Sequence, residues 1–164
     1  MTTKPIVVSD ATPLIALAKI GQLSWLRDLF DEVLIPGAVY SEIVVAGAGR
    51  SGSAEIRAAN WIQIIPVEDR TKVNYLLTQL DIGEAEAIVL AQEQQADWVL
   101  VDETKARAIA QRLGLRLIGT VGLLLLAKQQ GKIPAIRPLL DSLRHQQFRL
   151  SQTVYDAVLK QANE

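Results

Sequence analysis

The chain has 164 residues, of which 49% are hydrophobic and only 5% aromatic, and its 17 Lys and Arg against 18 Asp and Glu give a net charge of -1. This predicts a single domain over residues 1–164 with an aliphatic core, and it excludes a global basic field that would hold nucleic acid. With no cysteine and one histidine, disulfides, thiol nucleophiles and ordinary zinc sites are excluded. The sequence contains no signal-peptide pattern and no apolar run of membrane-spanning length, so we expect a cytoplasmic protein without a membrane partner.

Short apolar runs between turn residues predict strands, and helical periodicity predicts helices between them. The expected strands are 6–9, 32–36, 61–67, 97–102 and 115–119. The expected helices are 12–20, 23–31, 37–46, 54–60, 69–79, 83–95, 104–113, 120–130, 135–146 and 151–162. This alternation predicts a three-layer α/β/α fold with a central, mainly parallel sheet. The helices from about residue 134 form a helical C-terminal region that we expect to pack on it.

Acidic residues end two of the predicted strands, and a carboxylate beside the core is costly unless something offsets its charge. Asp10 follows the first strand. Capping a helix would be its ordinary use, but Thr12 followed by Pro13 makes the better helix start. Asp102 and Glu103 follow the most apolar strand, where a capping role is again the ordinary explanation. Open α/β sheets bind ligands at the carboxyl ends of their strands, so these acids could instead share a divalent cation such as Mg²⁺.

Three glutamates lie in predicted helices, and each has an ordinary explanation. Glu42, in the middle of its helix, would by itself be a solvated side chain. Glu84 and Glu86 lie in a first turn, where the helix dipole stabilises carboxylates. Because they are two residues apart, they point in different directions. Glu84 shares a face with Ala87 and Ile88, which favours it as the inward-facing acid, but both glutamates are retained.

The sequence has one local basic cluster, formed by Lys105, Arg107, Arg112 and Arg116. A solvated helix face and a contact to a phosphate backbone explain it equally well.

A dinucleotide-binding fingerprint is the strongest competing motif. Gly47, Gly49 and Gly52 form G-x-G-x-x-G after an apolar run. The segment 43–66 is nevertheless shorter than the roughly 30 residues of a βαβ unit, and its helix is too short for a parallel crossover. Dinucleotide binding is therefore a remote alternative.

Four segments in a fixed order resemble the PIN-like domains of a bacterial and archaeal group related to the VapC-type toxins. They are "VVSDATPLIALAKIG", "VYSEIV", "GEAEAIVLA" and "VLVDETKARAIAQRLGLRLIGTVGLLLLAKQQGKI". The resemblance covers roughly residues 5–160, and the terminal "LSQTVYDAVLKQANE" is similar to the closing helix of that group. It implies an α/β/α fold with a central parallel sheet and a ribonuclease that depends on Mg²⁺ or Mn²⁺.

The resemblance also implies roles for individual residues. Asp10 matches the first metal-binding acid, in a D-x-[ST] setting that Thr12 completes, and Glu42 matches the helical acid. The third acid most resembles Glu86, because "EAIVLA" matches the acid-Ala-x-x-x-Ala pattern of the family. The helical wheel instead favours Glu84, and the choice stays open.

The fourth acid of the family is matched by Asp102. Many PIN domains have Thr or Ser at this position and an acid slightly later, where this chain has Glu103 and Thr104. Lys105 and Arg107 follow directly and, with the threonine of the first motif, are the candidate substrate-binding residues.

The resemblance therefore implies a metal-dependent ribonuclease that acts as the toxin of a toxin–antitoxin pair. Its partners would be RNA, a small antitoxin protein and a second copy of the chain. The alternative is a PIN-like interaction module with weak catalysis. Apolar positions of the last two helices could then bind a dimer partner or an antitoxin helix, although core packing is their ordinary use. These positions are Leu139, Leu140, Leu143, Val154, Val158 and Leu159.

Overall fold

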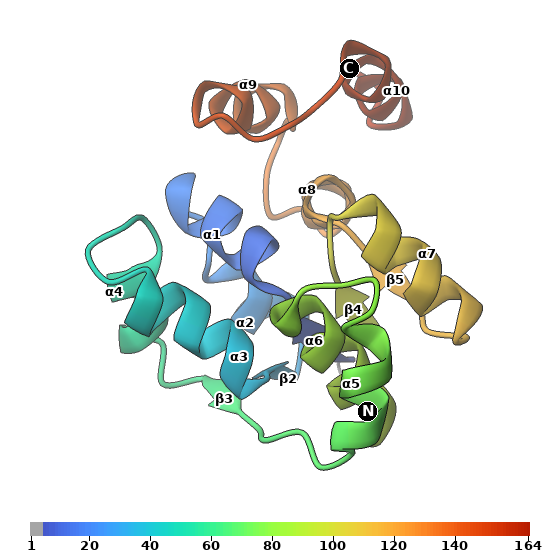
Figure 1. Cartoon of the computed structure of the whole chain (residues 1–164). Coiled ribbons are helices and arrows are strands. Elements are labelled where there is room, and N and C mark those ends of the chain that lie inside the picture. Colours follow the sequence, from blue (N-terminus) through green and yellow to red (C-terminus); the bar gives the residue numbers. More distant parts are fainter. Residues whose placement is uncertain (1–4) are drawn as a thin grey trace.

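The computed structural model describes residues 5–164, which form one five-stranded parallel sheet with helices around it (Figure 1). The strand order is β3-β2-β1-β4-β5. The strands are β1 (Ile6–Ser9), β2 (Glu32–Ile35), β3 (Ile62–Ile64), β4 (Trp98–Leu100) and β5 (Leu117–Ile118). The predicted parallel α/β/α fold is confirmed, and each predicted strand is present, although most are shorter than expected.

Helices cover both faces of the sheet, because successive residues of a strand point to opposite faces. Val7 lies in one core cluster and its neighbour Val8 in the other. The cluster around Val7 includes residues of α1 (Ala11–Lys19), α2 (Trp25–Leu29), α3 (Gly37–Tyr40), α4 (Ser53–Ala58) and α8 (Thr120–Gln129). The cluster around Val8 includes residues of α5 (Arg70–Leu76), α6 (Ile82–Glu93) and α7 (Thr104–Arg112).

The strand order reverses between β1 and β4, which lie side by side and parallel. Asp10 follows β1, and its backbone N–H donates to the carbonyl of Leu100, the last residue of β4, at 3.0 Å. The chain then leaves the two strands in different directions. This is the position at which open α/β sheets form a crevice for a ligand.

The start of α1 differs from the sequence prediction. The helix begins at Ala11, so Asp10 occupies the N-cap position, and the prediction that Thr12 caps the helix is wrong. Thr12 and Pro13 lie inside the first turn, where a proline costs no hydrogen bond because the first backbone N–H groups have no helical partner. The side chain of Asp10 makes no capping hydrogen bond.

The helix that carries Glu42 changes character along its length. It begins as α3 and widens into a π-helix, η1 (Ser41–Ala46). A Cβ atom at Gly47 would lie 2.6 Å from the carbonyl oxygen of Ile43, so only glycine fits at the end of this wide turn. The glycine-rich loop therefore follows a helix rather than a strand, which removes the structural setting of a dinucleotide fingerprint.

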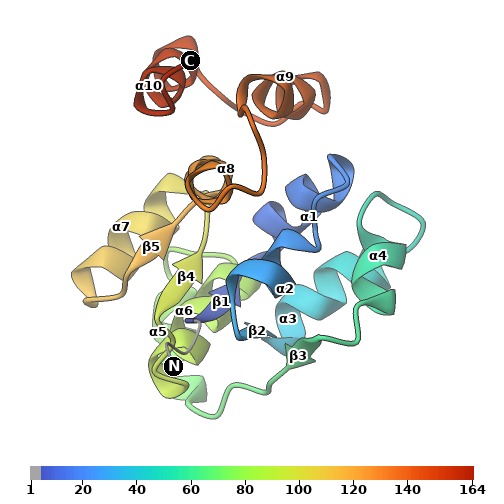
Figure 2. The same cartoon turned by 180° about the vertical axis from the view of Figure 1, so that it is seen from behind.

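The last two helices, α9 (Arg137–His145) and α10 (Gln152–Gln161), lie beyond α8 and α1 at one end of the molecule (Figure 2). Most of their apolar positions proposed as docking faces are buried in the cluster around Val7, and Val154 is 45% exposed. Glu164 accepts hydrogen bonds from the backbone N–H groups of Ile136 at 2.7 Å and Arg137 at 3.2 Å, and thereby joins the end of the chain to the start of α9.

In the described part of the chain, none of the helices has the length and apolar composition needed to cross a membrane.

Candidate active site

Three carboxylates from three segments gather around the start of α6. A Cβ atom at Gly83, the second residue of this helix, would lie 3.4 Å from Oδ1 of Asp10, 3.6 Å from Oδ1 of Asp81 and 3.7 Å from Oε1 of Glu42. Glycine leaves this space open. The acids come from the end of β1, the N-cap of α6 and η1, so folding brings Asp10 and Glu42 together as the sequence predicted.

Asp10 is the most strongly perturbed of these groups, with only 6% of its surface exposed. Burial raises the pKa of its carboxyl from 3.8 to about 7. The backbone N–H of Ala11 opposes this effect, whereas the negative charges of Asp81, Glu84 and Glu42 add to it. A nearby positive charge would therefore favour the charged form of Asp10.

We refer to Asp10, Glu42, Asp81 and Glu84 as the acidic group. The pKa of Glu84 is raised, first by partial burial and then by the charges of Asp81, Glu103 and Glu42, while a backbone hydrogen bond from Asp81 lowers it. Partial burial and the charge of Asp81 likewise raise the pKa of Glu42. Of the two glutamates left open by the sequence, Glu84 is the one whose charge raises the pKa of Asp10, and its own pKa is raised by Glu42.

Asp81 is an acid that sequence reasoning missed. Its Oδ1 accepts from the backbone N–H of Glu84 at 2.8 Å, while Oε1 of Glu84 accepts from the N–H of Asp81 at 3.0 Å. The pair forms a capping box that fixes both carboxylates at the start of α6. The spacing Asp-x-x-Glu before an apolar run was the available signal.

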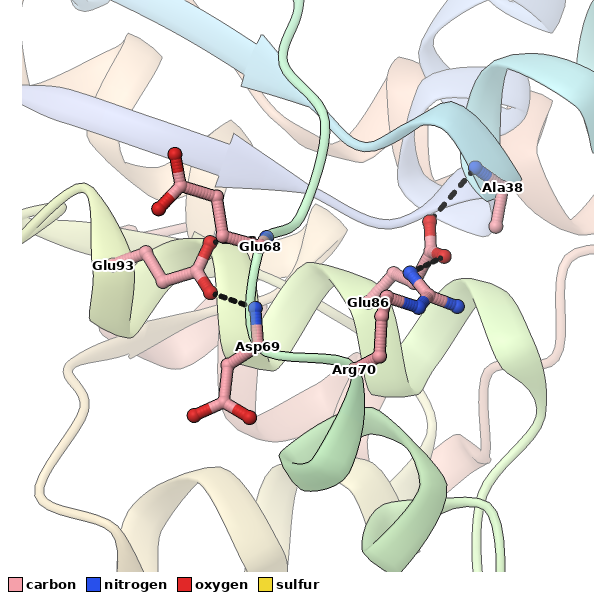
Figure 3. Close-up of polar contacts among 6 residues, drawn as sticks. All are labelled: Ala38, Glu68, Asp69, Arg70, Glu86 and Glu93. Atoms are coloured by element: carbon pink, nitrogen blue, oxygen red, sulfur yellow. Dashed lines mark hydrogen bonds and ion pairs between the residues drawn. The ribbon is translucent and has the colours of Figure 1, made fainter.

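Glu86 lies on another side of α6 and is fully engaged there (Figure 3). Its Oε1 accepts from the backbone N–H of Ala38 at 3.0 Å, and its Oε2 accepts from Arg70 Nη1 at 2.6 Å. About two helical turns further along α6, Glu93 accepts hydrogen bonds from the backbone N–H groups of Glu68 and Asp69, as Figure 3 also shows. These contacts hold α3 and the start of α5 against α6, and they do not support the predicted metal-binding role of Glu86.

Asp102 is likewise bound by a neighbour. Its two carboxylate oxygens accept from the backbone N–H of Thr120 at 2.8 Å and from Oγ1 of Thr120 at 2.6 Å. Burial raises the pKa of Asp102, while these hydrogen bonds and the charge of Arg107 lower it. Glu103 accepts from the N–H of Ala106 at 2.7 Å and is the acid on this side whose charge reaches Glu84. Asp102 therefore stabilises the start of α8, and Glu103 lies nearer the acidic group.

The basic cluster predicted from the sequence is dispersed by the fold. Nη1 of Arg107 donates to the carbonyl of Val101 at 2.7 Å, and the guanidinium of Arg116 lies 4.2 Å from the ring centre of Trp98. Arg112 lies in a separate groove beside α5. Lys105 remains exposed near the start of α7. Thr12 lines a cavity next to Asp102 and Glu103.

The carboxylates around Gly83 are oxygen donors of the kind that a divalent metal ion binds. Among residues 5–164, no three Asp, Glu or His side chains lie close enough, as they stand, to hold one ion. The oxygens around Gly83 are nevertheless hard donors converging on one open space, and Asp10 is a buried acid without a compensating charge. Mg²⁺ needs only one or two carboxylates, since it keeps several waters. Asp10 and Glu42, whose oxygens converge on this space, therefore fit a hydrated divalent cation.

Comparison with known proteins gives the family. Residues 6–164 match a family model described as a PIN domain. Among solved structures, the Mycobacterium tuberculosis VapC20 toxin, described as sarcin-ricin loop cleaving, matches with 15% identity and a TM-score of 0.49, over 62% of this chain and 94% of that one. No curated protein matches significantly. Because the family model spans nearly the whole chain, this protein belongs to the PIN domain family.

Proposed function

We propose that this protein is a Mg²⁺- or Mn²⁺-dependent ribonuclease and the toxin of a toxin–antitoxin pair. The observation that carries the proposal is the convergence of Asp10, Glu42 and Asp81 on the open space at Gly83, with Glu84 bound to Asp81 through the capping box. Membership of the PIN domain family supports it. Asp10, Glu42 and Glu84 would hold the cation, with Asp81 orienting Glu84.

The chemistry follows from the charge of these residues. A bound divalent cation would lower the pKa of a coordinated water and stabilise charge on a phosphate. The carboxyl of Asp10, whose pKa is about 7 in its present surroundings, would stay ionised beside a cation. Glu42 and Glu84, with raised pKa values, can accept a proton from a water near the phosphate. Cleavage of an RNA phosphodiester is the reaction that this set supports best.

The first experiment replaces Asp10 with Asn, which preserves size and removes the charge. We expect Mg²⁺- or Mn²⁺-dependent cleavage of RNA by the wild type and a loss of roughly a hundredfold or more in the variant, since the group holds the cation. Asp28→Asn is the matched control, because Asp28 is an exposed acid on α2, ahead of β2 and away from the carboxyl edge of the sheet. Undiminished cleavage by Asp10→Asn would reject the assignment.

A PIN-like interaction module with weak catalysis is the second candidate. The observation in its favour is Asp102, whose two oxygens are engaged by Thr120 instead of facing the acidic group. Growth arrest on expression distinguishes the two candidates. Arrest that disappears in Asp10→Asn supports the toxin, whereas arrest that persists in this variant supports an effect of binding alone.

A further inference from the structure

A groove beside the acidic group points to a path for the substrate. It is a cavity of about 550 Å³ between α1, the turn from β4 into α7, and residues 146–149, which connect α9 to α10. It is lined by Thr12, Asp102 and Glu103, and also by Lys19, Phe148 and Arg149. We call it the connector groove.

The connector groove adjoins the two segments that end at the proposed site. Thr12 is two residues from Asp10 on the same chain segment, and Asp102 and Glu103 follow β4, whose last residue, Leu100, accepts a hydrogen bond from the backbone N–H of Asp10 at 3.0 Å. The groove therefore lies beside the carboxyl ends of β1 and β4, where Asp10 is held.

Two cations of the groove have no protein partner. Within residues 5–164, neither Lys19 nor Arg149 forms an ion pair, and both side chains are exposed. In contrast, Arg107 and Arg116 of the basic cluster are occupied by Val101 and Trp98. With a net charge of -1, the chain has no general attraction for a polyanion, so local unpaired cations such as these are needed to bind one.

Phe148 adds an aromatic surface to the groove that the two cations line. It is partly exposed in the groove, while its remaining surface packs against the core. Single-stranded nucleic acids bind in grooves that combine cations for the phosphates with aromatic rings for the bases. We propose that the connector groove binds single-stranded RNA, with phosphates at Lys19 and Arg149 and one base at Phe148, and leads it to the acidic group.

This inference rests on the proposed function for the nature of the substrate, and it adds the binding surface. It gives the C-terminal helices a role in binding, because Phe148 and Arg149 lie in their connector. Lys19 and Arg149 attract phosphates, whereas Asp102 and Glu103, which line the same groove, repel them unless a cation is present.

The test measures binding of a short fluorescein-labelled single-stranded RNA by anisotropy at several KCl concentrations. Asp10→Asn serves as the background, so that the RNA stays intact. We expect Lys19→Ala combined with Arg149→Ala to weaken binding roughly tenfold, and to reduce the slope of log affinity against log salt by about 1.4, for two lost phosphate contacts at about 0.7 each. Phe148→Leu, which keeps an apolar side chain, should weaken binding about fivefold without changing the salt slope.

The matched control is Lys132→Ala combined with Lys160→Ala, which removes two exposed cations that do not line the groove. An equal loss of affinity in this control would overturn the proposal, as would wild-type affinity and slope in the groove variant. If the groove variant instead loses binding to a partner protein and keeps RNA binding, the groove is a protein site and the inference fails. Cleavage by the wild type is scored separately: a groove that binds RNA in a protein that does not cleave leaves the inference intact and rejects the ribonuclease.

Discussion

Gly83 shows how much one missing side chain contributes to the site. Its position in the first turn of α6 would suit almost any residue, and alanine would stabilise a helix by roughly 0.5–1 kcal/mol relative to glycine. A methyl group here would nevertheless come within 3.4–3.7 Å of oxygens from Asp10, Asp81 and Glu42. The space is therefore available to a hydrated cation only because the residue is glycine.

Gly83→Ala should separate stability from activity. We expect the free energy of unfolding to stay equal or to rise by up to about 1 kcal/mol, while metal-dependent cleavage falls roughly a hundredfold because the methyl group fills the space between the carboxylates that the cation and its waters would occupy. Denaturant unfolding and cleavage rates measure the two quantities. Full activity would show that this space is not used.

Asp10 predicts a pH dependence in metal-free protein. Because its folded pKa is raised from 3.8 to about 7, the native state binds more protons than the unfolded state in this interval, and stability falls as pH rises through it. Asp10→Asn removes this loss. Above about pH 7, in a chelator, we expect the variant to be more stable than the wild type by roughly 2–4 kcal/mol, with the gain disappearing towards pH 3.8.

Chemical unfolding at a series of pH values checks this expectation. Adding Mn²⁺ above pH 7 should stabilise the wild type more than the variant, since the cation binds the charged form. A pH-independent difference between the two proteins would show that Asp10 does not titrate in this interval.

Among the elements, α6 has two acidic sides with different uses. Its N-terminal turn carries Asp81 and Glu84 in a capping box beside Asp10. The other side carries Glu86, which is 7% exposed and binds Ala38 and Arg70, so that α3 and α5 are held in place (Figure 3). Since α3 continues into the π-helix that carries Glu42, the hydrogen bond from Ala38 to Glu86 helps to position Glu42.

Glu84→Gln and Glu86→Gln should therefore affect different properties, the first activity and the second stability. We expect Glu84→Gln to reduce metal-dependent cleavage by about tenfold to hundredfold with little change in stability, because it removes a charge from the acidic group. Glu86→Gln should lower the free energy of unfolding by about 1–3 kcal/mol, because it removes the charge paired with Arg70. Unfolding curves and cleavage rates measure the two effects. Loss of cleavage in Glu86→Gln and loss of stability in Glu84→Gln would instead assign the metal-binding role to Glu86.

On the scale of the whole molecule, the C-terminal helices share the main core. Leu140 and Leu143 of α9 are fully buried in the cluster that contains Val7 of the central strand. Oδ1 of Asp141 accepts from the hydroxyl of Tyr155 on α10 at 2.6 Å, which joins the two helices to each other. The prediction that the chain behaves as one domain stays to be tested.

Leu140→Ala tests that prediction. If the chain unfolds as one unit, this variant should lose about 2–5 kcal/mol in a single cooperative transition seen by all probes. Leu139→Ala, at a partly buried position of the same helix, should cost less. A separate early transition that melts only the helical signal would show that α9 and α10 form an independent unit.

The sequence by itself determined the elements and the placement of two acids. Short continuous apolar runs between turn residues predicted the strands, and the position of Asp10 directly after a buried strand placed it at the carboxyl edge of a parallel sheet, because these signals depend only on neighbouring residues. The N-cap of α1 was predicted at Thr12, two residues after its actual position at Asp10, since proline is accepted throughout a first turn.

Only the tertiary structure decided which acids meet. Glu84 and Glu86 are both good first-turn residues, and their separation depends on Ala38 and Arg70, which are distant in sequence. In the same way, Thr120 engages Asp102 across 18 positions, and Lys19 and Arg149 line one groove from opposite ends of the chain. Such choices depend on distances through space between segments, and local periodicity contains no information about them.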